Sequence, residues 1–146
     1  MELIEITDAR GALRQSEWLR RAERVHRQLR TALPEDYFKK MQRVFAEGGR
    51  MVVAVEGHDV RGVAVWRVYE NTSVGVHLYV DDLVTEEERR SGGVGHALMQ
   101  WLERRARELN CVALLLDSGT QRTRAHRFYF REGLYIVNFN FKKALA

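Results

Sequence analysis

The chain has 146 residues, of which 45% are hydrophobic and 30% are charged, and its formal net charge is +4 at pH 7. This length and hydrophobic content favour one compact domain over residues 1–146, because a chain of this size can bury a substantial core. No apolar run approaches the roughly 20 residues that cross a bilayer, and the N-terminus lacks the basic and then apolar order of a secretory signal. We therefore expect a cytoplasmic protein.

The distribution of charged residues also limits the classes of binding partner that we expect. Arginines alternate with glutamates along the chain, which is more typical of a solvated helix face than of a nucleic-acid surface. We expect a small anionic ligand and neither a nucleic-acid nor a membrane partner. The single cysteine, Cys111, cannot form an internal disulfide or a cysteine-rich zinc site, so we expect a small buried hydrophobic residue there and no metal.

The N-terminal half predicts one strand, two helices and three further strands. Residues 3–6 form the first strand, and a helix with apolar residues at helical spacing begins at Ser16. Pro34 fits the first turn of the second helix, because proline is tolerated where no intrahelical N–H bond is needed. The next three strands are rich in β-formers, and a hairpin signal joins the first two; they cover residues 50–56, 62–69 and 74–84.

The C-terminal half alternates between helix and strand. A glycine-rich turn at residues 90–95 opens a helix with one apolar stripe, which Asn110 can close. A strand, a second helix and an alternating final strand follow at residues 111–116, 118–133 and 135–141, the helix starting with a Ser118-x-x-Gln121 box. The fold class is therefore α/β, with a mixed, mostly antiparallel sheet of about six to seven strands flanked by about four helices.

The glycine-rich turn, Arg90-Ser91-Gly92-Gly93-Val94-Gly95, is placed where a phosphate group can bind. A helix N-terminus leaves about four backbone N–H groups without intrahelical partners and carries about half a positive charge. The glycines let an extended anion approach the main chain. A plain helix cap is the alternative that needs no ligand.

Two nucleotide-binding motifs fit this turn poorly. A Walker loop needs lysine and then serine or threonine after its last glycine, and the chain has His96 there. A dinucleotide-binding turn is closer, because Asp117 follows at the end of an apolar strand, where a ribose-binding acid belongs. However, Leu98 occupies the position of the third glycine, and a polar stretch at residues 85–91 separates strand and glycines.

The segment from Val80 to Gly95 resembles the coenzyme A segment of the GNAT N-acetyltransferases, Gln/Arg-x-x-Gly-x-Gly/Ala, which Arg90, Gly93 and Gly95 fill. Residues 125–134, Ala-His-Arg-Phe-Tyr-Phe-Arg-Glu-Gly-Leu, resemble that family's Ala-x-x-Phe-Tyr-x-x-x-Gly-Phe segment. The two motifs stand in the family's order, whereas the N-terminal half matches only in the order of its elements. The chain departs from the family at Arg122, where asparagine is frequent.

The resemblance implies the GNAT fold and an acyltransferase that moves an acetyl group from acetyl-CoA to an amine by direct attack. The pyrophosphate would lie on the amides of the glycine turn and the pantetheine arm along the end of the preceding strand. The implied cofactor-binding residues are Leu83, Val84, Thr85, Arg89, Arg90, Ser91, Gly92, Gly93, Val94, Gly95 and His96. A coenzyme A-binding sensor or interaction module without turnover is the alternative.

The acceptor amine must lose a proton before it attacks, because a primary amine has a pKa of about 10.4 in water. Asp81 is the first choice of base, since it precedes the end of the strand and shares a face of an alternating strand with His77. A bulge would shift that alternation, so Asp82, or His77 through water, stays open. Tyr129 stands where the family has the general acid that protonates the departing thiolate.

The acceptor is a small-molecule or peptide amine whose class stays open. The connection between the first two helices, which shapes the acceptor side in the family, contains both Arg30 and Glu35-Asp36. These residues suit an acidic and a cationic acceptor respectively. An apolar or aromatic acceptor is the third possibility, which would suit Trp66, Tyr69 and Tyr79. Aromatic residues of the final strand, among them Phe139 and Phe141, make a homodimer a further expectation.

Overall fold

The computed structural model describes residues 1–89 and 92–146. They form two compact units, Met1–Leu115 and Leu116–Ala146, which are described separately below. The expectation of one domain over residues 1–146 stays a prediction. Among the described residues, no helix is both long and apolar enough to cross a membrane.

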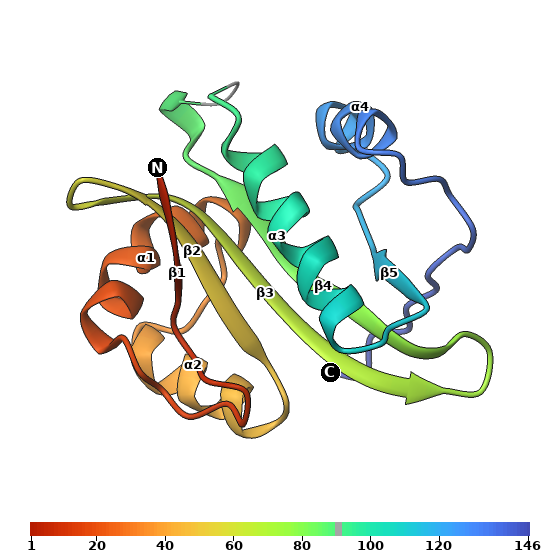
Figure 1. Cartoon of the computed structure of the whole chain (residues 1–146), viewed down its shortest axis with the longest axis horizontal. Coiled ribbons are helices and arrows are strands. Elements are labelled where there is room, and N and C mark those ends of the chain that lie inside the picture. The colour runs from red at the N-terminus through yellow and green to blue at the C-terminus, as the bar shows by residue number, and fades with distance from the viewer. Residues whose placement is uncertain (90–91) are drawn as a thin grey trace. The chain divides into compact units, whose positions relative to one another are not determined.

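A sheet with the strand order β1-β2-β3-β4-β5 organises the first unit (Figure 1). The strands are β1 (Glu2–Glu5), β2 (Arg50–Glu56), β3 (Asp59–Asn71), β4 (Gly75–Thr85) and β5 (Ala113–Leu116). The first four pair antiparallel with their neighbours. A helix joins β4 to β5, which is the connection that parallel neighbours require, so the sheet is mixed as expected.

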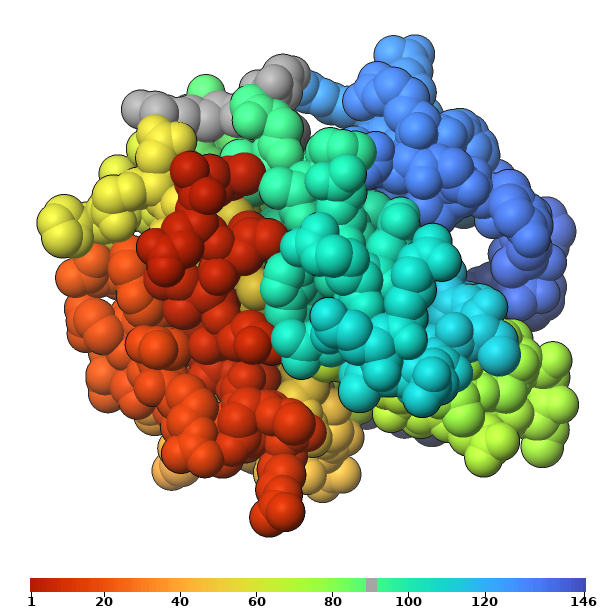
Figure 2. Space-filling model, in the orientation of Figure 1, coloured from red at the N-terminus to blue at the C-terminus, as the bar shows by residue number. Residues whose placement is uncertain are grey.

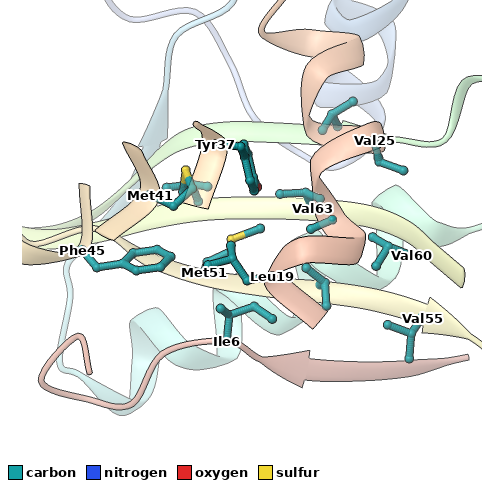
Figure 3. Close-up of a cluster of buried hydrophobic side chains, with 14 residues drawn as sticks. Ile6, Leu19, Val25, Tyr37, Met41, Phe45, Met51, Val55, Val60 and Val63 are labelled. Atoms are coloured by element: carbon teal, nitrogen blue, oxygen red, sulfur yellow. The ribbon is translucent and has the colours of Figure 1, made fainter. Parts of the chain in front are cut away.

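Helices cover both faces of this sheet. They are α1 (Ser16–Leu29), α2 (Tyr37–Ala46), the 3₁₀ turn η1 (Glu87–Arg89) and α3 (Val94–Glu108). Side chains of α1 and α2 pack with Val63 and Val65 of β3 in a buried hydrophobic cluster (Figure 3). Gly62, which precedes Val63 on the strand, faces α3 instead. Because successive strand residues point to opposite faces, α3 lies on the face opposite to α1 and α2.

On one surface of this unit, β1 and α3 lie side by side (Figure 2), and an ion pair of 2.6 Å joins Arg105 to Glu5. The guanidinium of Arg105 also lies 5.9 Å from the ring centre of Trp66 in β3. These contacts hold the C-terminal half of α3 against the sheet, so the helix is fastened at the end remote from the glycine turn.

The described residues form five strands, fewer than the six to seven expected. The predicted final strand at residues 135–141 is wrong, because the structure leaves this segment irregular. Its aromatic side chains do not bury one face, since Tyr135, Phe139 and Phe141 are 79%, 84% and 90% exposed. Alternation alone does not make a strand, which also needs a hydrogen-bonded neighbour. The homodimer stays a prediction.

Local capping explains two differences at helix starts. The second helix begins at Tyr37 rather than around Pro34, because the Asp36 carboxylate accepts a hydrogen bond of 3.0 Å from the backbone N–H of Lys39. In the second unit, α4 (Thr123–Arg131) begins after the proposed Ser118 box, and the Ser118 hydroxyl caps nothing. The predicted ends of α3 and α4 agree with the structure, since Asn110 and Gly133 both have positive φ just after these helices.

Candidate active site

The N-terminus of α3 has the geometry of an anion site. Gly93 is its N-cap residue with a φ of 79°, a conformation that favours glycine, and its carbonyl accepts a 3.0 Å hydrogen bond from Ala97. Gly92 and Gly93 are exposed. In an α-helix the first backbone N–H groups, here those of Val94 and Gly95, have no acceptor within the helix. Arg90 and Ser91, which precede them, lie outside the described residues, and so does the side chain of Arg89.

A second glycine brings this helix end against the end of β4. Gly62 pairs in register with Thr85, the last residue of β4. A Cβ on Gly62 would lie 2.7 Å from Val94 Cγ1 and 2.8 Å from Leu98 Cδ1, closer than real contacts allow. The absence of a side chain therefore lets the first turn of α3 sit directly on β3, beside the strand end where the cofactor arm is expected.

The link from β4 to the glycine turn is fastened to α1 by a buried carboxylate. Glu86 is 2% exposed, forms an ion pair with Arg24 and accepts a 3.0 Å hydrogen bond from Gln28. Gln28 also accepts a hydrogen bond of 2.9 Å from the backbone N–H of Glu87. The sequence offered no signal for this role, because Glu86 stands in a run of glutamates and its partners lie 58 to 62 residues away.

Glu86→Gln is expected to reduce stability most above pH 5. Burial would raise the pKa of Glu86, but hydrogen bonds and charge from Arg24 and Gln28 outweigh it, so the pKa lies below its usual value. A carboxylate with a lowered folded-state pKa stabilises above its unfolded pKa, and this contribution disappears as the pH falls through the folded value. Urea unfolding at pH 7 should show a loss of about 1–2 kcal/mol.

Urea unfolding repeated between pH 3 and pH 7 shows how the stability loss of Glu86→Gln depends on pH. The difference between wild type and Glu86→Gln should shrink towards acid pH. Glu87→Gln is the matched control, because the Glu87 side chain is exposed and should change stability little at any pH. A Glu86→Gln loss of equal size at pH 3 and pH 7 would contradict the assignment.

A bulge in β4 presents two consecutive aspartates on one face of the sheet. Val65 pairs with Asp82 and Trp66 with Val80, which leaves Asp81 without an opposite residue. Asp82 contacts His26 of α1, and Asp81 contacts Arg67, which also donates 3.1 Å to the carbonyl of Glu47 after α2. The simple alternation behind the choice of Asp81 is therefore interrupted, and both carboxylates face the side of α1 and α2.

Asp81 is held by an arginine. Its Oδ2 accepts hydrogen bonds of 2.9 Å and 2.6 Å from Nε and Nη2 of Arg67. His77, the third candidate base, is 1% exposed, and its Nδ1 lies 2.9 Å from the carbonyl of Gly75. Its ring packs edge to face on Tyr69 at 4.3 Å. The base role of Asp81 stays a prediction, with Asp82 and His77 as alternatives.

Asp82 ends a buried chain of hydrogen bonds. His26 Nε2 lies 2.7 Å from Asp82 Oδ2, and His26 Nδ1 lies 2.8 Å from the hydroxyl of Tyr37. His26 and Tyr37 are 1% and 2% exposed, whereas the side chain of Asp82 is 14% exposed. Arg30 donates from Nε to the other Asp82 oxygen at 2.6 Å and from Nη2 to the Asp81 carbonyl at 2.9 Å. Asp82 is thus the most exposed of the three hydrogen-bonded side chains.

The surroundings set the protonation of this chain. Burial would raise the pKa of Asp82, but the hydrogen bonds and charges of His26 and Arg30 outweigh it and hold the pKa below its usual value. Burial raises the pKa of Tyr37, so its hydroxyl keeps its proton. The Asp82 carboxylate can only accept a hydrogen bond, so Nε2–H of His26 donates to it, whereas the Tyr37 hydroxyl can donate to or accept from Nδ1. Sequence reasoning missed His26, because it looks like any residue of an amphipathic helix.

The proposed general acid lies in the second unit. Tyr129 is on α4, partly buried, with its ring 5.5 Å from that of Phe128. His126 on the same helix lies 2.8 Å, through Nε2, from the carbonyl of Gly119. The first unit contains both aspartates, the end of β4 and the glycine turn. Within the described residues, no group of three or more His, Cys, Asp or Glu is arranged to hold a metal.

The chain is similar in sequence to known N-acetyltransferases. The chain is 32% identical over 119 residues to the uncharacterized N-acetyltransferase YhdJ of Bacillus subtilis, covering 80% of this chain and 84% of that protein. It is 36% identical over 66 residues to an aminoalkylphosphonate N-acetyltransferase of Salmonella typhimurium, covering 45% of this chain and 43% of that protein.

The fold is that of solved acetyltransferases. An aminoglycoside N-acetyltransferase solved in complex with CoA superposes with a TM-score of 0.78 at 13% identity, covering 99% of this chain and 95% of that chain. At this identity the likeness shows the fold alone, and it confirms the expected fold class. The sequence model of the acetyltransferase (GNAT) family matches residues 13–133. The chain therefore belongs to the GNAT acetyltransferase family.

Proposed function

We propose that this protein is an acetyl-CoA-dependent N-acetyltransferase that acetylates a small-molecule amine by direct attack on the thioester. One observation carries the proposal: the glycine-capped N-terminus of α3 is held against the end of β4 by the close contact at Gly62. This places an anion site beside a strand end, which is the arrangement that a phosphate-bearing cofactor with an extended arm needs.

The cofactor would occupy both features. Its pyrophosphate would accept hydrogen bonds from the N–H groups at residues 92–96, with Arg89 or Arg90 as counter-charge. Its pantetheine arm would lie along Leu83–Thr85 as an added strand. Strand β5 has only four residues and begins beside Val76, whose carbonyl accepts from Val112 at 2.8 Å, so the end of β4 extends beyond it. A backbone N–H there would stabilise the charge on the thioester oxygen.

The reaction needs two proton transfers. The acceptor ammonium must lose a proton before its nitrogen attacks the thioester carbon, and the bulge carboxylates, Asp81 and Asp82, are the candidate acceptors. As the C–N bond forms, the C–S bond breaks, and Tyr129 would protonate the leaving thiolate. The net products are an acetylated amine, coenzyme A and one released proton.

A small amine that also carries an acidic group is the acceptor class that the observations favour. The matched relative from Salmonella typhimurium is named for aminoalkylphosphonates, which combine an amine with a phosphonate. Beside the bulge, the Arg30 side chain is 50% exposed although its Nε and Nη2 are bound to Asp82 and Asp81. Its exposed edge would bind the acidic group while a bulge carboxylate takes the ammonium.

Thermal shift and thiol release test the proposal. A ligand of the folded state raises the melting temperature, so acetyl-CoA and free CoA should raise it, whereas NAD and DNA should not. Thiol release is then measured with 1-aminoethylphosphonate, 2-aminoethylphosphonate, a lysine peptide and spermidine. Release with the phosphonates above the other amines is expected. A thermal shift without thiol release on any amine would favour a coenzyme A-binding sensor instead.

Two glycine variants localise the binding. Gly93→Ala should reduce the acetyl-CoA shift, because alanine disfavours the φ of 79° that shapes the turn. Gly57→Ala is the matched control: Gly57, in the β2–β3 hairpin, also has a positive φ of 63° and open space around it. The two substitutions should therefore cost similar stability. If acetyl-CoA raised the melting temperature of both variants equally, the glycine turn would not be part of the cofactor site.

A further inference from the structure

We propose that the protein forms a homodimer in which residues 135–141 of each copy pair with the partner's strand β5, along the edge of β5 that faces away from β4. This exchange would extend each five-stranded sheet by one strand, supplied by the second copy. The inference does not depend on the proposed activity. It rests on two features of the same chain, the open edge of β5 and the irregular segment at residues 135–141.

Strand β5 presents backbone groups that a further strand could bind. It is the last strand in the order β1-β2-β3-β4-β5, so within the described residues one of its edges faces no other strand. The N–H of Val112, just before β5, donates to the Val76 carbonyl of β4 at 2.8 Å. Because successive residues of a strand point their backbone groups to opposite sides, the N–H and C=O groups of Ala113 and Leu115 point to the open edge.

The opposite edge of the sheet is protected, whereas the edge at β5 is not. Proteins prevent an edge strand from pairing with another chain by placing charges, proline or a bulge on it. Strand β1 has a glutamate at each end, and Glu5 forms an ion pair with Arg105. Strand β5 reads Ala-Leu-Leu-Leu, and its four apolar side chains are all only half-buried. A strand from a second copy would cover both the open edge and these side chains.

Residues 135–141 have the pattern that such a strand needs. The segment Tyr-Ile-Val-Asn-Phe-Asn-Phe contains no charged residue, proline or glycine, and apolar side chains occupy every odd-numbered position. Asn140 donates a side-chain hydrogen bond to Asp117 of its own unit, whereas its neighbours Phe139 and Phe141 are 84% and 90% exposed. The segment therefore has the alternation of a strand, and pairing with a second copy would supply the hydrogen-bonded neighbour.

The exposed side chains of the segment provide enough area for a dimer interface. An aromatic side chain buries about 150–250 Å². Burying the largely exposed Tyr135, Phe139 and Phe141 of both copies would remove roughly 1,000 Å² from water, the area at which specific interfaces begin. Ile136 and Val137 are also exposed and would add to this area. A two-fold axis makes the contact twice, because a closed dimer uses the same surfaces of each copy.

Analytical ultracentrifugation of the full chain tests the dimer. At micromolar concentrations the wild-type protein should sediment at twice the monomer mass. Phe139→Lys should sediment as a monomer, because it places an unpaired charge in an apolar interface. Phe130→Lys is the matched control, since Phe130 is 54% exposed on α4 and lies outside residues 135–141, and this variant should remain a dimer. A monomeric wild type, a dimeric Phe139→Lys or equal loss of the dimer in both variants would overturn the proposal.

Amide hydrogen exchange measured by NMR identifies the edge that pairs. The amides of Ala113, Leu115 and residues 135–141 should exchange more slowly in the wild-type dimer than in Phe139→Lys, because a strand ladder protects them. The amides of β1 should exchange equally in both proteins. A dimer in which Ala113 and Leu115 exchange as fast as in Phe139→Lys refutes pairing at β5. A wild-type monomer that sediments with phosphatidylglycerol vesicles would assign residues 135–141 to a membrane surface and also refute the proposal.

Discussion

Tyr129→Phe is expected to lower kcat by roughly 100-fold or more while acetyl-CoA still binds. The substitution removes the hydroxyl that would protonate the departing thiolate and leaves the ring in place. The packing of that ring on Phe128, with centres 5.5 Å apart, should survive, so α4 should remain folded. Thiol release measures kcat, and the acetyl-CoA thermal shift measures binding on the same preparation.

Two controls make this result specific. Tyr135→Phe is the same substitution in the same unit at a side chain that is 79% exposed, and it should not change turnover. A thioester of a much more acidic thiol, such as 4-nitrothiophenyl acetate, needs no protonation of its leaving group. Tyr129→Phe should therefore be less impaired with that donor than with acetyl-CoA. Unchanged turnover with acetyl-CoA would remove Tyr129 from the mechanism.

Features encoded by neighbouring residues could be predicted from the sequence. The glycine turn could be placed because Gly93 caps α3 and a helix cap depends on local backbone conformation. The antiparallel strands and the crossover helix follow from hydrophobic periodicity, which is also local. The end of α4 near Gly133 has the same origin, since a residue with positive φ commonly follows a helix.

The features that the sequence did not reveal depend on distant contacts. The bulge at Asp81 exists only in the pairing of β4 with β3, so counting residues along β4 alone misplaces its face. His26 and Asp82 are 56 positions apart and meet only because α1 packs beside β4. The failed strand at residues 135–141 has the opposite cause: its alternating pattern was correct, but pairing decides whether a strand forms.

Leu98→Ala is expected to destabilise the fold by about 2–5 kcal/mol, because Leu98 is fully buried and its loss leaves a cavity between α3 and β3. Urea unfolding of the whole chain measures this loss. Gly62→Ala should cost about 1–3 kcal/mol for the opposite reason, since its new methyl group collides with Val94 and Leu98. It should also weaken the acetyl-CoA shift, because it moves the first turn of α3 away from Thr85.

The double variant decides whether Gly62 sets the position of α3. With Leu98 shortened, the Gly62→Ala methyl group enters the vacated space, and only its collision with Val94 remains. The double loss should therefore fall short of the sum of the single losses by about 0.5–3 kcal/mol. Leu19→Ala is the control partner, because Leu19 is equally buried but packs in the cluster on the opposite face. The stability losses of Gly62→Ala and Leu19→Ala should add. Additivity in both pairs would show that the close contact at Gly62 does not position the helix end where the cofactor is expected to bind.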